Sequence, residues 1–378
     1  MTLCAFALVS FEFMPVSLLS PIAADLHLSE GEAGQAISAC ALAALVTSLV
    51  MTRTIGDIDR RRVLLALTAL TIISAAIVAF APNFPILLVG RAFVGIALGG
   101  FWSLSAATAM RLVPAPSVPK ALAIVNAGPA LASTVAAPVG SFLGGLLGWR
   151  GAFLSFIPLA VAALIWLLIA LPSLPARRSA DSSSTIGLLR IPGVAHGYLG
   201  ALAFFAGAFW LYTYLRPFLE QVTHVGVGLL SGILLLVGIA GFVGTAVIGR
   251  FVGPRIHLTL AALPAILAII AFGLAVEGQS VVMTTALLVL WGFASTATPV
   301  VWWTWVTRQA SSNPEAGGGL MVAVAQIGIG GGAMGGGIVF DASGPVATVL
   351  ASSAILAVAT LIAFTIHRRP RLTHASAA

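Results

Sequence analysis

The chain begins with the apolar run Thr2-Leu-Cys-Ala-Phe-Ala-Leu-Val-Ser-Phe-Glu-Phe-Met-Pro-Val-Ser-Leu-Leu-Ser-Pro21, which contains one acidic residue, Glu12. A helix needs roughly 20 apolar residues to cross about 30 Å of hydrocarbon, and this run has that length. No cationic segment or small-residue cleavage motif accompanies the run, so we expect a transmembrane span and not a cleaved signal peptide. Glu12 is the only acidic residue of the chain inside such a run.

The composition of the whole chain extends this expectation. Of 378 residues, 60% are hydrophobic and only 8% are charged. This leaves too little polar surface to cover a soluble globule of that size, which indicates a polytopic membrane protein. The net charge of +7 does not indicate a nucleic-acid partner, because the basic residues lie in short segments between apolar runs and not on one solvated face.

Roughly twelve apolar runs follow one another along the chain. Because a segment in lipid must satisfy its backbone hydrogen bonds internally, each run is expected to be a helix. The sequence therefore predicts an all-α polytopic membrane protein with 12 transmembrane helices. The approximate cores of the runs are residues 2–21, 34–52, 63–81, 85–108, 120–144, 150–171, 195–217, 228–249, 258–276, 281–305, 317–340 and 346–366.

The distribution of charge predicts the orientation of these spans. Most Arg residues fall in the segments that follow the even-numbered runs, as Arg60, Arg61 and Arg62 do after the second. Short loops rich in Lys and Arg stay in the cytoplasm, so we expect those segments and both termini to be cytoplasmic.

A polar and basic segment at residues 172–192 interrupts the apolar runs near the middle of the chain. It predicts a cytoplasmic linker between an N-terminal six-helix bundle, residues 1–171, and a C-terminal six-helix bundle with a short basic tail, residues 193–378. Two pseudo-equivalent bundles are typical of a transporter that rocks around a central site. The alternative is an accidental loop between unrelated halves.

Several motifs carry a resemblance to a known family. Phe11 to Leu26, Val89-Gly-Arg-Ala-Phe-Val-Gly95, Gly148-Trp-Arg-Gly-Ala-Phe153 and Tyr214-Leu-Arg-Pro-Phe-Leu219 resemble motifs of the major facilitator superfamily, in its 12-helix drug:proton antiporter branch. More narrowly, the stretches 99–106, 110–114, 118–122 and 137–144 resemble the bacterial purine ribonucleoside efflux pumps. The resemblance implies a proton-coupled antiporter in the bacterial inner membrane that exports inosine- or guanosine-type nucleosides by alternating access.

The resemblance also implies gating residues, with two departures from the family pattern. Asp59, Arg60 and Arg61 match the loop after the second span, but this loop lacks the glycine that usually precedes the arginines. Gly128, Pro129 and Pro138 match the antiporter motif of the fifth span. There Pro138 leads to Ser141-Phe142, whereas the family usually has a glycine pair.

Glu12 and Arg91 are the predicted proton-coupling residues. Arg91 lies roughly 9 Å inside the 85–108 run, at 1.5 Å per residue. An intramembrane cation needs a partner, and Glu12 is the only intramembrane anion, so we expect the two to pair. Two alternatives stay open: Arg91 bonds helix carbonyls, or Glu12 serves helix packing.

Aromatic and amide residues are the candidates for the substrate site. Trp102 is expected to stack on a base, and Asn126 and Gln326 to bond its edge or the ribose hydroxyls. Tyr212 is a further candidate for substrate binding. Bundle packing, contacts between helices and an interfacial position of Tyr212 are the alternatives. Three further tryptophans near the end of the tenth span are expected to form an aromatic belt: Trp302, Trp303 and Trp305.

The sequence does not indicate an enzyme. Its only lysine, Lys120, follows a proline, so there is no Walker A phosphate loop. We expect no cofactor or metal, a monomer, and lipid, protons and a small molecule as partners. Two other functions stay open: export of a drug, sugar or amino acid, or a membrane receptor or assembly factor that keeps the fold without transport.

Overall fold

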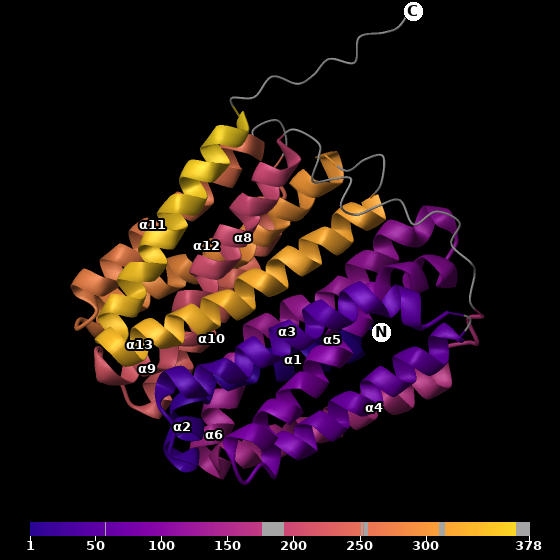
Figure 1. Cartoon of the computed structure of the whole chain (residues 1–378), viewed down its shortest axis with the longest axis horizontal. Helices are drawn as coiled ribbons and strands as arrows, with labels where there is room; N and C mark the ends of the chain where they lie inside the picture. The colour runs from indigo at the N-terminus through magenta and orange to yellow at the C-terminus, as the bar shows by residue number, and fades with distance from the viewer. Residues whose placement is uncertain (57, 176–192, 251, 253–255, 310–313, 368–378) are drawn as a thin grey trace, which may run out of the picture.

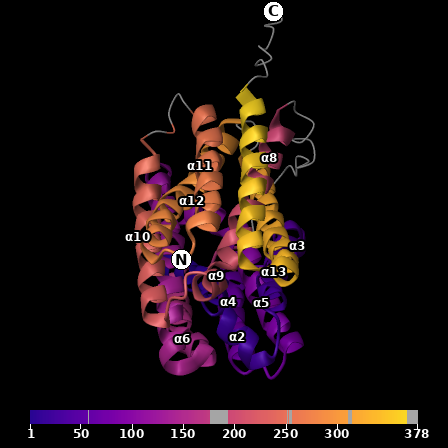
Figure 2. The same ribbon diagram turned by 90° about the vertical axis from the view of Figure 1, so that its left-hand side faces the viewer.

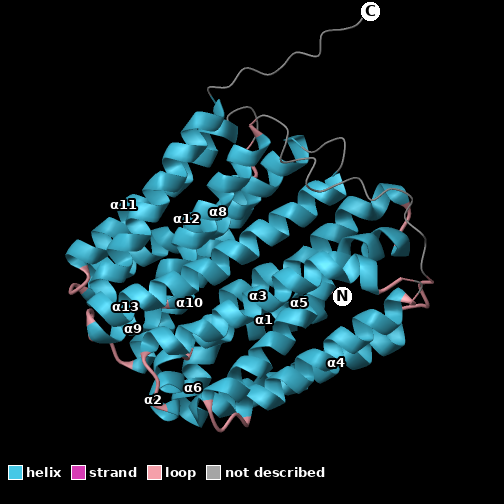
Figure 3. Cartoon of the chain, viewed as in Figure 1, coloured by secondary structure: helices cyan, strands magenta, loops and turns pink. Residues whose placement is uncertain are grey.

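Helices joined by short loops make up the part of the protein that the computed structural model describes, namely residues 1–378 without 57, 176–192, 251, 253–255, 310–313 and 368–378 (Figures 1 and 3). No strand occurs in these described residues. The fold class expected from the hydropathy is therefore confirmed.

Six α-helices and one short 3₁₀ helix form the first half of the chain, and six α-helices form the second. The first half contains α1 (Thr2–Ser17), α2 (Leu19–Leu26), α3 (Glu30–Thr54), α4 (Arg60–Ala79), α5 (Phe84–Leu112), η1 (Ala115–Ser117) and α6 (Val118–Ala170). The second contains α8 (Val194–Thr213), α9 (Leu215–Gln221), α10 (Val227–Ile248), α11 (Ile256–Glu277), α12 (Val281–Gln309) and α13 (Pro314–His367).

The number of spans agrees with the expected twelve once two breaks are taken into account. Nine described helices are long and apolar enough to cross a membrane, and the bent pair α1–α2, with 66° between its parts, makes ten. Both α6 and α13 are about twice the length of one crossing and contain a non-helical glycine, Gly148 at φ 72° and Gly344 at φ 83°. Glycine tolerates this left-handed backbone without a Cβ clash. Dividing both helices there gives twelve spans.

Buried apolar side chains form two main clusters. One lies entirely within residues 4–174, and the other lies within residues 194–363 apart from Val16, Ile37, Ala41 and Ala137. Small residues allow the helices within a cluster to approach closely. A Cβ on Gly95 or Gly99 of α5 would lie 2.2–2.3 Å from a main-chain oxygen of α3. In a membrane such packing replaces the hydrophobic effect between helices.

The expected aromatic belt is wrong for two of its three members. Trp302 is 0% exposed and Trp305 1% exposed, whereas Trp303 is 39% exposed. The two buried indoles fill the space left by glycines of α8: a Cβ on Gly197 would lie 1.8 Å from Trp305. Gly197 and Gly200 therefore leave room for these two indole rings inside the bundle.

The two halves meet mainly toward one end, which we call the α9 end and which contains α2, the start of α3, α9 and the start of α10. There α13 packs against α3 and α10 against α6 (Figures 1 and 2). A third, small apolar cluster contains residues of both halves: Leu19, Ala23, Ala33, Tyr214 and Phe340. Hydrogen bonds between the halves also gather there, for example from Ser38 Oγ to the Gly330 oxygen at 2.9 Å. The opposite end, where α6 ends and α8 begins, is the linker end.

Most of the predicted linker, residues 176–192 of 172–192, lies outside the described residues. The start of the linker packs onto the first half, where Leu174 belongs to the buried cluster, as does Leu171 just before the linker. The assignment of the segment as a cytoplasmic linker between two bundles stays a prediction.

Candidate functional site

Arg91 occupies the centre of the first half and bonds main-chain oxygens. The side chain is 1% exposed, and its Nη1 and Nη2 donate to the oxygens of Phe11 at 2.6 Å and Glu12 at 3.0 Å. Its Nε donates to the Ala36 oxygen of α3 at 3.1 Å. Because Pro15 has no N–H, the Phe11 oxygen lacks its helical i+4 donor, and Arg91 supplies one. The guanidinium therefore joins α5 to α1 and α3.

The expected ion pair between Arg91 and the Glu12 carboxylate is wrong. Among the described residues the ion pairs join Arg150 to Asp25 and Arg216 to Glu220. The alternative that Arg91 bonds helix carbonyls is what the geometry shows. Both groups are buried, and the Arg91 charge interacts with the Glu12 carboxyl through space.

The Glu12 carboxyl lies close to a side chain from the other half of the chain. Glu12 is 8% exposed, and its carboxyl lies close to the side chain of Gln326 on α13, which is 7% exposed. Among the described residues, the Gln326 Oε1 has no hydrogen-bond partner. Two of the predicted site residues, one from each half, are therefore brought together at the interface.

An aromatic cluster that includes Phe13, the residue after Glu12, also joins the halves. Phe13 of α1 stacks on Phe209 of α8 with ring centroids 5.9 Å apart, and it meets Tyr212 edge-on at 6.1 Å. Phe209 and Tyr212 contact each other at 5.8 Å. Tyr212 was expected at the site, whereas Phe13 and Phe209 were missed. The position of Phe13 next to Glu12 was the signal that could have found it.

In the part of the chain that the structure describes, the contacts found for Trp102 and Asn126 lie outside this group. Trp102 is half-buried and packs edge-on against Phe101 at 6.0 Å. Asn126 is exposed, and its Nδ2 donates to the Leu122 oxygen of its own helix at 2.9 Å. At 100° per residue, Asn126 lies on the side of α6 roughly opposite the exposed Ile124. A substrate role for these two residues stays a prediction.

The loop between α3 and α4 binds the chain after α6 in the same half. Asp59 accepts hydrogen bonds from the Ser173 hydroxyl at 2.5 Å and from the Leu174 and Arg61 N–H groups at 2.9 and 2.8 Å. These bonds hold the pKa of the Asp59 carboxyl below its usual value. Arg60 Nη1 lies 3.3 Å from the Ile58 oxygen, and Arg61 Nη2 donates to the Leu168 oxygen at 2.6 Å. The contacts found for these three residues stay within the first half, and their gating role stays a prediction.

The predicted antiporter motif of α6 is a close packing site against α1. A Cβ on Gly128 would lie 2.3 Å from the Thr2 oxygen. Pro129 and Pro138 lie inside α6, but the non-helical backbone of this helix is at Gly148. Bending of α6 is therefore located 20 residues away from Gly128, and a gating role of Gly128, Pro129 and Pro138 stays a prediction.

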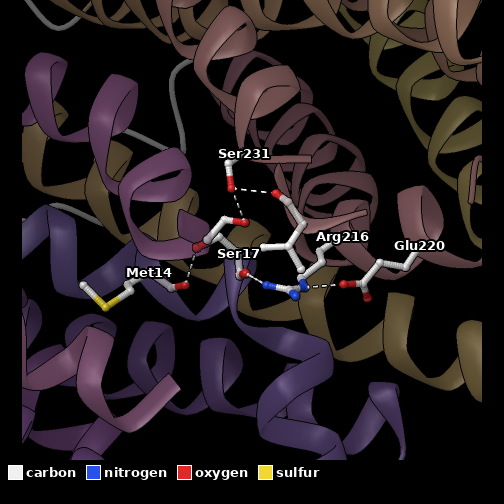
Figure 4. A network of polar contacts seen from close by, with 7 residues as sticks. Met14, Ser17, Arg216, Glu220 and Ser231 are labelled. Carbon is white, nitrogen blue, oxygen red and sulfur yellow. Dashed lines mark hydrogen bonds and ion pairs between the residues drawn. The ribbon is translucent and has the colours of Figure 1, made fainter. Parts of the chain in front are cut away.

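A second polar group lies at the α9 end (Figure 4). Arg216 of α9 donates to the Glu220 carboxylate at 2.8 Å and to the Ser17 oxygen at the end of α1. Ser231 of α10 donates to Ser141 of α6 at 2.9 Å. The Arg216–Ser17 and Ser231–Ser141 contacts cross between the halves, and the sequence reasoning singled out neither.

Comparison with known sequences finds a matching family and several similar proteins. The sequence profile described as the Major Facilitator Superfamily matches residues 1–330. The transcription regulatory protein OpdE of Pseudomonas aeruginosa is 50% identical over 363 residues, which are 95% of this chain and 90% of that protein. The purine ribonucleoside efflux pump NepI of Escherichia coli K12 is 40% identical over 359 residues, 95% of this chain and 91% of the pump.

Solved structures share the fold at low sequence identity. A bacterial homologue of the human lysosomal transporter Spinster, in an inward-facing and unoccupied conformation, matches with a TM-score of 0.78 and 19% identity. The match covers 97% of this chain and 96% of that one. The human organic anion transporter MFSD10 matches with a TM-score of 0.68 and 16% identity, over 96% of this chain and 98% of that one.

Proposed function

Because this chain belongs to the Major Facilitator Superfamily, we propose that it is a proton-coupled antiporter that exports purine ribonucleosides. The observation that carries the proposal is the contact between Glu12 and Gln326, since it joins a titratable carboxyl in one half to an amide in the other. A protonated carboxyl donates a hydrogen bond and an ionised one only accepts. Protonation therefore changes the bonding between the two halves.

The cargo follows from the relative and from the chemistry of the interface. The 40% identical relative is named a purine ribonucleoside efflux pump. A purine offers a π-face for the rings of Phe13, Phe209 and Tyr212, and it offers N–H donors for the buried Gln326 Oε1. A partnerless buried oxygen is costly, so a ligand that donates to it gains affinity. We include Trp102 and Asn126 as residues that contact the nucleoside at another stage of the cycle.

The transport cycle alternates access through the two ends. We propose that the linker end and both termini face the cytoplasm of a bacterium, with the chain in the inner membrane as a monomer of two bundles, 1–171 and 193–378. The halves meet at the α9 end, so this conformation corresponds to access from the cytoplasm. Nucleoside enters from there, and a proton taken up outside by Glu12 returns inward.

The energy of one proton is sufficient for useful export. A single charge that falls through an assumed potential of about 150 mV yields roughly 3.5 kcal/mol. At 1.4 kcal/mol per tenfold change, this corresponds to a gradient of about 300-fold. One carboxyl group at Glu12 is therefore enough for the proposed exchange.

Uptake of radiolabelled inosine into inside-out vesicles, with and without an imposed pH gradient, tests cargo, direction and coupling together. We expect the gradient to drive accumulation in the wild type and Glu12→Gln to abolish it with the protein still present in the membrane. The matched control is Glu277→Gln, which changes an exposed carboxyl at the end of α11. A Glu12→Gln variant that accumulates inosine like the wild type would sink the mechanism.

One finding favours a second candidate function. The 50% identical relative is named a transcription regulatory protein. In a membrane protein of this fold, such an effect is most simply indirect, through the intracellular level of a transported compound. The same vesicles given a sugar, an amino acid or a drug in place of inosine distinguish a different cargo. Absence of transport with all of them would favour a sensor without transport.

A further inference from the structure

The carboxylate of Asp341 in α13 crosses to the other half and bonds the start of α3. Its Oδ1 accepts from the Gly31 N–H at 2.9 Å, and its Oδ2 accepts from the Ser29 hydroxyl at 2.7 Å. We call Asp341, Ser29 and Gly31 the clamp. Asp341 and Ser29 are 312 positions apart, so this contact exists only where the two halves meet.

The clamp completes the cap of α3. Ser29 is the N-cap residue and forms a capping box with Glu32: its Oγ accepts from the Glu32 N–H at 3.0 Å, and its own N–H donates to the Glu32 carboxylate at 2.9 Å. The capping box leaves the Gly31 N–H without a partner inside the helix, as is usual in a first turn. Asp341 satisfies that N–H, and its negative charge lies at the positive end of the helix.

Glycines around the clamp let α3 and α13 approach closely enough for its hydrogen bonds to form. A Cβ on Gly31 would lie 2.3 Å from the Asp341 Oδ2 and 2.5 Å from the Gly337 oxygen. A Cβ on Gly34 or Gly337 would lie 2.0 or 2.5 Å from the Tyr214 hydroxyl. Tyr214 in turn bonds the Ala333 oxygen at 2.7 Å and stacks on Phe340 with ring centroids 5.3 Å apart. Glycines on α3 and α13 therefore bring the two backbones together around the carboxylate.

We propose that Asp341 is a positioning residue of the transport cycle, which holds the α9 end closed by capping α3 across the interface. For this end to open, both hydrogen bonds of the clamp must exchange for water. The contact is partly exposed, so its loss favours opening by a moderate factor. We expect the ratio of open to closed α9 ends to rise roughly tenfold when Asp341 is replaced, which corresponds to about 1.4 kcal/mol. The proposal does not depend on the identity of the cargo or on proton coupling.

Distances between spin labels in the full-length protein in lipid nanodiscs test the proposal. One label pair, Pro82→Cys with Gln279→Cys, spans the halves at the α9 end, where both positions are exposed. A second pair, Pro116→Cys with Arg250→Cys, spans them at the linker end, again at exposed positions. The native Cys4 and Cys40 are buried and 1% exposed, so they are poor labelling sites.

With Asp341→Ala we expect a larger population of long distances at the α9 end and a matching population of short distances at the linker end. Asp341→Asn keeps one acceptor oxygen and should shift the populations less. Gly31→Ala keeps the carboxylate but obstructs its approach, and it should act in the same direction. This variant decides the matter if the Asp341 variants do not fold. Glu277→Gln at the same end should leave all distances unchanged.

Three results would overturn the proposal. The first is unchanged α9-end distances in both Asp341→Ala and Gly31→Ala. The second is a shift toward shorter distances there. The third is widening at the α9 end without shortening at the linker end, which would mean that the clamp only stabilises the start of α3.

Discussion

Arg91 and Arg216 bond the same helix in two different regions of the molecule. Arg91 donates to the Phe11 oxygen of α1, and Arg216 donates to the Ser17 oxygen of α1. Each of these oxygens lies four residues before a proline, Pro15 or Pro21, so the helical N–H that would normally bond it does not exist. Both arginines are buried, at 1% and 4% exposure.

The difference between the two regions lies in where the arginine comes from. Arg91 belongs to the same half as α1, so its bonds can persist through a movement of one half against the other. Arg216 belongs to the other half and must release Ser17 if the halves separate at the α9 end. Glu220, four residues after Arg216, stays bound to it and limits the cost of that release. The same chemistry therefore serves architecture at Arg91 and conformational change at Arg216.

The largest effect is expected from Arg91→Met, and it is an effect on the free energy of unfolding. The change leaves the Phe11 oxygen buried without a donor, and we expect a loss of roughly 3 kcal/mol in the free energy of unfolding. Thermal unfolding of the purified protein, followed by tryptophan fluorescence, measures it. Pro15→Ala restores an N–H four residues after Phe11, so it should rescue part of the loss in the double variant. Strictly additive effects of the two changes would refute the assignment of Arg91 to the carbonyl freed by Pro15.

An intermediate effect of a different kind is expected from Arg216→Gln. Because Arg216 bonds across the halves, its replacement should change severalfold the population of molecules with long label distances at the α9 end. Its stability loss should be smaller than that of Arg91→Met, at about 1 kcal/mol. Label distances and thermal unfolding, measured for both Arg91→Met and Arg216→Gln, therefore distinguish the roles of the two regions. A larger change in label distances for Arg91→Met than for Arg216→Gln would contradict the assignment of Arg91 to architecture and Arg216 to conformational change.

The smallest effect is expected from Asp59→Asn, which changes a contact within one half and on its surface. The pKa of Asp59 is lowered in the folded protein, mainly by the Ser173 hydroxyl and the Leu174 N–H. The stabilisation that the ionised Asp59 carboxyl gives the folded protein is therefore present above pH 3.8, its ordinary pKa. This stabilisation is lost as the pH falls through the lower pKa of the folded state. We expect a small decrease in the melting temperature at pH 7 that disappears under strongly acidic conditions. A difference that grows on acidification would contradict these contacts.

Much of the fold could be predicted from hydropathy, because a membrane span needs a long apolar run and a helix. The runs 34–52 and 63–81 correspond to α3 and α4. Trp302 and Trp305 were misplaced because residue type alone does not reveal that Gly197 and Gly200 leave room for indole rings.

The candidate site was predicted only in part. Glu12 and Gln326 were singled out as rare polar groups inside apolar runs, and the structure brings them together. The predicted ion pair of Glu12 with Arg91 was wrong because it rested on matching charged side chains. Arg91 instead bonds main-chain oxygens, which carry no formal charge. Pro15, four residues after Phe11, was the signal in the sequence that pointed to a carbonyl in need of a donor.

Composition and hydropathy alone determine that this chain lies in a membrane as a series of helices, because the cost of burying an unbonded backbone applies wherever the chain folds. Which groups meet across the interface is a property of the tertiary structure. Gly31 and Asp341 are 310 positions apart, and local propensity has no influence on such a contact. It depends on how closely two helices approach, and here that distance is set by glycines that have no side chain to keep the backbones apart.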